Sequence, residues 1–263
     1  MQEVLAITLA SMHQDMNRLD RVALNLANVS TPGYKREVVA MRPFVNVVDE
    51  MGVMTHGLTS GSTTSDPALT PGAMQVLQDA RPGTLKQTGE ALDVALASEG
   101  FFEVNTDAGP AYTRQGNFRV DARGRLVTAQ GYPVMGRNGE IHLTTQTPVI
   151  DAAGNITEPN ATTGPSVASP GSPVAQIKVV SFDNVRTMQR LGDGLMAAGS
   201  GMTVVNEADA HVRQGSLENA NVSSMQEMVQ LIQTMRHFES MQKITQGYDE
   251  MLGTAIHKLG ELS

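Results

Sequence analysis

The sequence contains no cysteine and no tryptophan among its 263 residues. Without cysteine there is no disulfide bond, no thiol nucleophile and no cysteine-ligated zinc or iron–sulfur site. Basic residues are also scarce, because 19 Lys and Arg stand against 27 Asp and Glu and leave a net charge of −8. A protein that binds nucleic acid needs a basic face to neutralise phosphate, so this balance argues against nucleic acid as a partner.

Long apolar runs are missing too, and no stretch approaches the roughly 18 apolar residues of a membrane-spanning helix. The acidic start Met1-Gln2-Glu3 lacks the features of a cleavable signal peptide. We therefore expect no membrane insertion, and either a cytoplasmic protein or one exported without a cleaved signal. Aromatic residues make up only 4%. A stable monomer and a protein that buries part of its surface only by assembling both fit this composition.

Apolar residues near the N-terminus recur with the alternating three- and four-residue spacing of a coiled coil. The spacing predicts a helix from about Val4 to Asn28. Pro32 and Gly33 suit the centre of a type II turn, and the residue before a proline avoids the helical region, so the helix should end by about Ser30. The predicted seam consists of Leu5, Leu9, Met12, Met16, Leu19, Ala23 and Leu26.

A second, longer helix is expected at the C-terminus, where Ser224 and Glu227 have the spacing of a capping box. A helix of about 35 residues is roughly 50 Å long and cannot bury an apolar stripe alone. We therefore expect it to pair with the N-terminal helix. Its predicted seam consists of Met225, Val229, Ile232, Met235, Phe238, Tyr248, Leu252, Ala255 and Leu259.

The middle of the chain has a different character. Clusters of Gly, Pro, Ser and Thr indicate an extended linker over residues 37–87. Residues 88–210 read as short strands separated by turns such as Asn138-Gly139, which predicts a small antiparallel β domain. The expected fold class is thus α+β. A helix and turn at 1–36 and a helix at 211–263 form a coiled-coil stem for the central, mainly antiparallel β domain.

The sequence contains no recognisable pattern of catalytic residues. None of the six histidines has the spacing of a zinc-binding helix. Residues 192–197 match a dinucleotide-binding pattern, but they lack the strand and helix that such a loop needs. We predict no catalytic residues, no cofactor and no metal.

The segment Asn25-Leu-Ala-Asn-Val-Ser-Thr-Pro-Gly-Tyr-Lys35, after a helix with heptad spacing, resembles the signature of bacterial flagellar rod and hook proteins. Residues 88–102, 112–136 and 215–229 resemble further segments of the same family, in the same order. The resemblance implies a turn at the end of the first helix. Its residues in this sequence are Asn25, Asn28, Thr31, Pro32, Gly33 and Tyr34.

The resemblance implies a structural subunit of the basal-body rod, exported by the flagellar type III system without a cleaved signal. Such subunits polymerise helically across the periplasm into the shaft that carries motor torque to the hook. The implied partners are copies of the chain, other rod and hook axial proteins, the export gate and the surrounding basal-body rings. Phe44 and Val48 have the form of the family's export-gate motif, with a plain linker strand as the alternative.

Chain length and the segment Arg236-His-Phe-Glu239 favour a proximal rod protein over a distal rod or hook-type subunit. Two remoter alternatives belong to other classes of protein. A cell-wall-acting enzyme would use the β domain and would need a carboxylate or Glu/His site. A binding module with a coiled-coil stem would form a closed dimer at all concentrations.

Overall fold

The computed structural model describes residues 2–41, 74–158 and 173–260. The chain divides into two compact units, which are described separately. The first, the helical unit, comprises Met1–Ala27, Glu37–Gln75 and Ser223–Ser263. The second, the β unit, comprises Asn28–Arg36 and Val76–Val222. Both units therefore contain segments that are far apart in the sequence.

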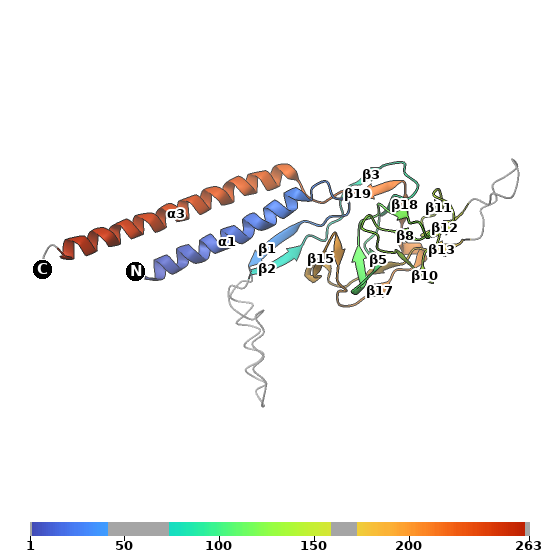
Figure 1. Cartoon of the computed structure of the whole chain (residues 1–263), viewed down its shortest axis with the longest axis horizontal. Coiled ribbons are helices and arrows are strands. Elements are labelled where there is room, and N and C mark those ends of the chain that lie inside the picture. Colours follow the sequence, from blue (N-terminus) through green and yellow to red (C-terminus); the bar gives the residue numbers. More distant parts are fainter. Residues whose placement is uncertain (1, 42–73, 159–172, 261–263) are drawn as a thin grey trace, which may run out of the picture. The chain divides into compact units, whose positions relative to one another are not determined.

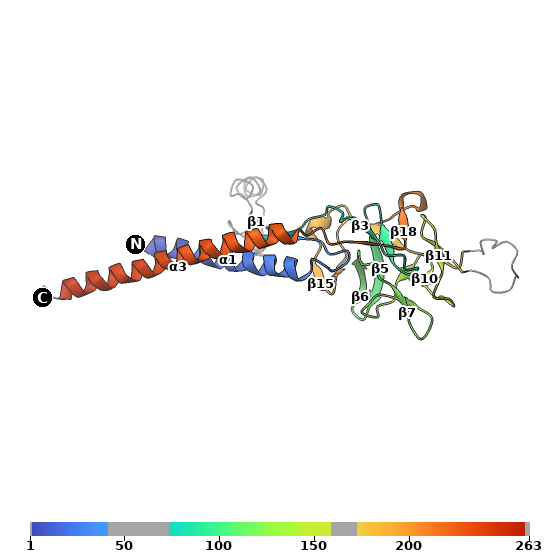
Figure 2. The same ribbon diagram turned by 90° about the horizontal axis from the view of Figure 1, so that it is seen from above.

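The helical unit is built on two long helices. Helix α1 spans Gln2–Ala27 and helix α3 spans Ser224–Gly260. They lie side by side in both views, and α3 continues past the start of α1 (Figures 1 and 2). The expected pairing of the terminal helices is confirmed. Helix α1 ends before Ser30, as the following Pro32-Gly33 turn requires.

A six-stranded antiparallel sheet forms the largest element of the β unit. Its strands β5 and β6 are a hairpin joined at Asp107 and Ala108, and β14 pairs with the other side of β5. The order across the sheet is β15 (Arg190–Gly192), β16 (Leu195–Met196), β6 (Gly109–Thr113), β5 (Phe101–Thr106), β14 (Val179–Ser181) and β17 (Thr203–Val204).

Shorter antiparallel pairings complete the β unit. Strands β18 and β19 return the chain alongside β4 and β3. These pairs are β4 (Val94–Leu96) with β18 (Val212–Gln214), β3 (Leu85–Gln87) with β19 (Ser216–Glu218), β7 (Arg119–Val120) with β8 (Leu126–Val127), and β9 (Met135–Gly136) with β10 (Gly139–Glu140). A three-stranded sheet contains β11 (Val149–Ile150), β12 (Asn155–Thr157) and β13 (Ala175–Gln176).

The remaining described elements are two strands and two short 3₁₀ helices. Strand β1 (Glu37–Met41) pairs with β2 (Met74–Gln78). The 3₁₀ helices are η2 (Val185–Thr187) and η3 (Glu207–Asp209). Strands β1, β2 and β3 all lie in the stretch 37–87 that the sequence assigned to a linker.

Side chains of β5 enter two separate hydrophobic clusters, because successive residues of a strand point to opposite faces. Phe102 packs with Val94 and Leu126 in the larger cluster. Phe101 packs with Tyr112 and Phe182 in the smaller one. The ring centroids of Phe102 and Phe118 are 5.2 Å apart, and those of Tyr112 and Phe182 are 4.8 Å apart. The few aromatic residues thus concentrate in the β unit. The paired terminal helices and the central antiparallel sheets confirm the predicted α+β class.

The turn signals of the sequence reappear in the β unit. The Asp121 carboxylate accepts hydrogen bonds from the backbone N–H groups of Arg123 and Arg125, at 2.8 and 2.9 Å. The predicted turn at Asn138-Gly139 lies one residue earlier in the structure, at Arg137 and Asn138. Gly139, with a φ of +118°, begins β10 and pairs with Gly136 across the β9–β10 hairpin. Short polar side chains and glycine stabilise such turns because they bond to the local backbone or tolerate a positive φ.

Candidate assembly interface

The two long helices pair in an antiparallel arrangement through polar contacts. Near the C-terminal end of α1, the Asn25 amide donates to a Glu227 carboxylate oxygen at 3.3 Å. Ten residues earlier in α1, Asp15 Oδ2 lies 2.6 Å from His237 Nδ1. Asp15 and Glu227 are both buried. The contacts 25–227 and 15–237 define one antiparallel register over the C-terminal half of α1.

The packed face of α1 is shifted by one residue from part of the predicted seam. Leu9, Met16 and Ala23 are exposed, and Thr8, Asp15 and Val22 are buried in their place. Polar residues are tolerated there because they have partners: the Thr8 hydroxyl donates to the Leu5 carbonyl oxygen at 3.0 Å, and Asp15 bonds to His237. The buried or half-buried face consists of Leu5, Thr8, Met12, Asp15, Leu19, Val22 and Leu26.

Helix α3 shows the same division into a packed and an exposed face. In its predicted seam, Phe238 and Tyr248 are half-buried and Leu252 is exposed. The structure does not describe the side chains of Ala255 and Leu259. The packed face consists of Glu227, Leu231, Thr234, Phe238, Met241, Thr245 and Tyr248, again at alternating spacings of four and three. The exposed face carries what we term the apolar stripe: Met225, Met228, Val229, Ile232 and Met235.

The two flanks of the helix pair differ in chemistry. One flank has a polar hollow of about 260 Å³, lined by Ser11, Gln14, Asp15, Arg18, Gln230, Gln233, Thr234 and His237. A helix rotates by about 100° per residue. This rotation places Leu9 and Met16 of α1 on the other flank, together with Met228 and Met235 of α3. Exposed apolar residues that gather on one flank make it a candidate interaction surface.

The signature residue Asn25 and the nearby Glu37 join the end of α1 to strand β1. The Asn25 side chain donates to the Glu37 carbonyl oxygen and accepts from the Glu37 N–H, each at 2.9 Å. Two hydrogen bonds of the Asn25 side chain thus hold the backbone of Glu37, the first residue of β1, in addition to the bond between Asn25 and Glu227. Arg21 adds an ion pair to the Glu37 carboxylate at 3.0 Å.

The remaining signature residues form a tight turn in the β unit. The Tyr34 N–H donates to the Thr31 carbonyl oxygen, which closes a turn with Pro32 and Gly33 at its centre. Gly33 has a φ of +66°, as the predicted type II turn requires. A Cβ on Gly33 would lie 2.5 Å from the Arg114 carbonyl carbon and oxygen. The Asn28 side chain accepts from the Thr31 hydroxyl at 3.2 Å.

A buried cluster of charges follows this turn. Lys35 Nζ lies 2.6 Å from Glu218 Oε1, and Arg114 Nη1 lies 3.3 Å from Glu218 Oε2. Lys35 and Glu218 are each 2% exposed at the side chain, although 183 residues separate them in the sequence. Lys35 also donates to the Arg81 carbonyl oxygen, and the Gly83 N–H donates to Glu218. One carboxylate therefore joins four segments of the β unit.

Electrostatics make Glu218 essential to this cluster. Burial lowers the pKa of the Lys35 ammonium, and the adjacent Glu218 carboxylate opposes that shift. Burial likewise lowers the pKa of Arg114, again opposed by Glu218. Without the carboxylate, two cations would be left in a buried site.

Sequence reasoning did not single out these three charges. Lys35 ends the signature segment, Arg114 lies in the stretch 112–136, and Glu218 lies in the stretch 215–229. Each therefore sits in a segment that carries the family resemblance. The stretches 112–136 and 215–229 contain other charged residues as well, among them Arg119 and Glu227, so nothing in the sequence singles out these three.

Asn221 connects the end of the β unit to the same segments. Its side-chain carbonyl accepts from the Arg36 N–H at 2.6 Å, and its amide donates to the carbonyl oxygens of Asp79 and Arg81 at 2.9 Å each. The Arg190 guanidinium lies 4.1 Å from the centre of the Tyr34 ring. These contacts hold residues 33–36 rigidly within the β unit.

A bound metal ion and a membrane span would each point to another class of protein. Among residues 2–41, 74–158 and 173–260, no group of three or more His, Cys, Asp or Glu side chains is placed to hold a metal ion. Across the same residues, no helix combines the length and the apolar character needed to span a bilayer. Phe44 and Val48 lie outside the described residues.

Two family models match this chain. That of the flagellar basal body rod FlgEFG protein C-terminal region covers residues 213–257, and that of the flagellar hook protein FlgE/F/G D1 domain covers residues 95–174. The flagellar basal-body rod proteins FlgF of Salmonella typhimurium and Escherichia coli are each 32% identical over 97% of both chains. The basal-body rod protein FlgG of Bacillus subtilis is 27% identical, over 95% of this chain and 96% of its own.

These similarities define the class as structural proteins of the bacterial flagellum. The chain belongs to the FlgF/FlgG family of flagellar basal-body rod proteins. It is accordingly a structural subunit of the rod, which assembles with other rod subunits, and not an enzyme.

Replacing Gly33 by valine should destabilise the β unit and impair rod assembly. A branched residue at positive φ costs about 1–3 kcal/mol, and the Cβ also collides with the Arg114 backbone. Gly89→Val is the matched control, because Gly89 has a φ of +80° but no atom within 4 Å of its Cβ position. Thermal unfolding should show the larger loss for Gly33→Val. Equal losses, or normal rods carrying Gly33→Val, would contradict the role given to this turn.

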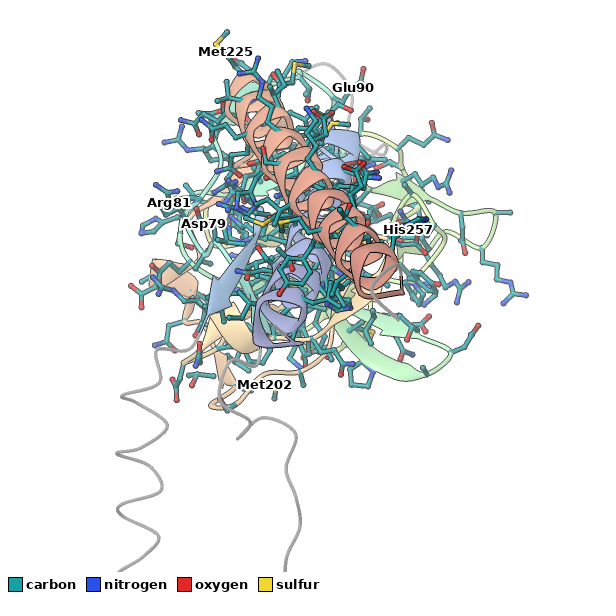
Figure 3. The ribbon with its side chains drawn as sticks, turned by 90° about the vertical axis from the view of Figure 1, so that its left-hand side faces the viewer. Asp79, Arg81, Glu90, Met202, Met225 and His257 are labelled. Atoms are coloured by element: carbon teal, nitrogen blue, oxygen red, sulfur yellow. The ribbon has the colours of Figure 1, made fainter. Side chains whose placement is uncertain are left out.

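Replacing Glu218 by glutamine should reduce the free energy of unfolding by about 3–5 kcal/mol, since it leaves buried cations without their carboxylate. Adding Lys35→Met should recover part of that loss by removing one cation. The measurement is a double-mutant cycle in denaturant unfolding, with Arg81→Gln as a surface control that should change stability little, because Arg81 is exposed beside Asp79 (Figure 3). Strictly additive losses would show that the two charges do not interact.

Proposed function

We propose that this rod subunit polymerises helically, with copies of itself and with other rod and hook axial proteins, through the apolar stripe of α3. The observation that supports the proposal is the exposure of all five stripe residues, between 49% and 77%, on the face of α3 turned away from the packed one. Leu9 and Met16 extend the apolar surface onto α1. In this proposal, some residues of the predicted assembly seam pair α1 with α3, and the others contact neighbouring subunits.

Burial of the stripe supplies the energy of assembly. Fully burying one aliphatic or methionine side chain stabilises a contact by about 1.5–3 kcal/mol, and the ordering of side chains offsets part of that gain. A stripe that meets a different surface on the neighbouring subunit forms a heterologous contact. Such contacts produce a helical filament when the rotation between subunits does not close a ring.

The same proposal includes the route and the mechanical role of the subunit. The chain leaves the cytoplasm through the flagellar type III export gate without a cleaved signal, with Phe44 and Val48 as the recognition motif. It joins the rod inside the basal-body rings and transmits motor torque to the hook. Rigid attachment of the signature turn suits this role, because Asn221 and Glu218 fix residues 33–36 through several hydrogen bonds.

Within the rod, we assign the chain to the proximal part. Its length of 263 residues and the segment 236–239 support this position over a distal rod or hook-type subunit. Of that segment, His237 takes part in the pairing of α3 with α1 through Asp15.

Replacing Ile232 by glutamate should block assembly without unfolding the chain, because the new charge lies on the exposed stripe. Gln226→Glu is the matched control, since it introduces the same charge at an exposed polar position two turns earlier in α3. Complemented motility and isolated basal bodies give the readout, and circular dichroism checks the fold. Rods of normal length carrying Ile232→Glu would contradict the assembly role of the stripe.

Deleting the gene should arrest the basal body before the distal rod and hook are built. Electron microscopy of basal bodies from the deletion strain measures the stage of arrest. Structures that arrest only after the distal rod is complete would overturn the proximal assignment.

A further inference from the structure

We propose that the thioethers of Met225, Met228 and Met235 are a site of reversible oxidation by hydrogen peroxide, which prevents an oxidised subunit from joining the rod. The inference rests on the proposed function, because it requires the apolar stripe to be the assembly surface. Three of the five stripe residues are methionines. Their modification would therefore change most of that surface at once.

Peroxide can reach these sulfur atoms in the free chain. Met225 is 77% exposed, Met228 51% and Met235 49%, and the Met225 side chain projects outward from α3 in Figure 3. Met188 and Met196 in the β unit are 5% and 2% exposed. Susceptibility to oxidation follows exposure. The β unit thus supplies internal references that should react far more slowly.

The chemistry needs only the thioether and the peroxide. The sulfur lone pair attacks one oxygen of hydrogen peroxide, an S–O bond forms, the O–O bond breaks and water leaves. Methionine loses two electrons and becomes the sulfoxide, while the peroxide is reduced. The chain has 16 methionines and no cysteine, so no thiol of its own competes for the oxidant.

Oxidation alters the assembly surface and spares the helix pair. A sulfoxide is polar, and burying it against an apolar neighbour without a hydrogen-bond partner is unfavourable. The packed face of α3 instead contains Leu231, Phe238 and half-buried Met241, on another side of the helix. Subunits already in the rod have the stripe covered, so the effect falls on subunits that have not yet joined. Methionine sulfoxide reductases reverse the change.

The test treats the purified full-length chain with hydrogen peroxide, maps sulfoxides by peptide mass spectrometry and measures polymerisation by sedimentation. Modification at the three stripe methionines should precede that at Met188 and Met196 and should lower the extent of assembly at least about tenfold. Met16 is also exposed on this surface, at 56%, so the triple variant Met225→Leu, Met228→Leu and Met235→Leu is made in a chain that already carries Met16→Leu. This triple variant should keep assembling after peroxide, because leucine conserves volume and is not oxidised. Met202→Leu, at an exposed methionine of the β unit (Figure 3), should remain as sensitive as the wild type.

Enzymatic reduction of the sulfoxides is an independent test. It remains valid even if the triple variant assembles poorly before peroxide treatment. Reductase treatment of the oxidised wild-type chain should restore assembly as the three stripe sulfoxides disappear. Undiminished assembly of a chain oxidised at these three positions would overturn the proposal, and so would equal loss in a competent triple variant. If Ile232→Glu blocks assembly while oxidation does not, only this proposal fails. If Ile232→Glu assembles normally, the stripe is not the interface and the proposed function fails first.

Discussion

The buried carboxylate of Glu218 is the interaction on which the β unit depends. It meets the ammonium of Lys35 and the guanidinium of Arg114, and it accepts the Gly83 N–H. Charges removed from water are costly, and the two facing cations and the Gly83 N–H offset part of that cost. Among the described residues, Glu218 Oε2 and Arg114 Nε have no hydrogen-bond partner, so this arrangement depends on the attraction between the charges. It ties the signature turn to the last strand of the unit, where the Gly33 N–H donates to the Glu218 carbonyl oxygen at 2.7 Å.

In the helical unit, the same two helices pair with each other and, in the proposed function, also present the contact surface for other subunits. Polar residues specify the internal register through directed bonds, as Asp15 does with His237 and Asn25 with Glu227. Buried polar groups can fix the register of a coiled coil in this way. With that pairing satisfied, the apolar side chains of the stripe remain available for neighbouring subunits.

The proposed function gives a reason for the apolar surface that α3 leaves exposed. For an isolated protein such a surface is a liability for aggregation. In the proposed rod contact, neighbouring subunits cover it. The methionine content fits this use, since methionine adapts its shape to neighbours that meet it in different ways. The same side chain brings a sensitivity to oxidants that leucine would not have.

Local patterns in the sequence determined where the elements lie. Heptad spacing located both helices, Pro32-Gly33 ended the first one, and Asp and Gly residues marked the turns of the β unit, because these signals act through the backbone of neighbouring residues. Tertiary structure alone decided which face of each helix is packed. In α1, two heptad registers are possible, and both contain Leu5, Met12, Leu19 and Leu26. The spacing of these four residues cannot decide whether Leu9 or Thr8 lies on the packed face with them. That choice, like the meeting of Lys35 with Glu218, depends on partners far away in the sequence, which become neighbours only when the chain folds.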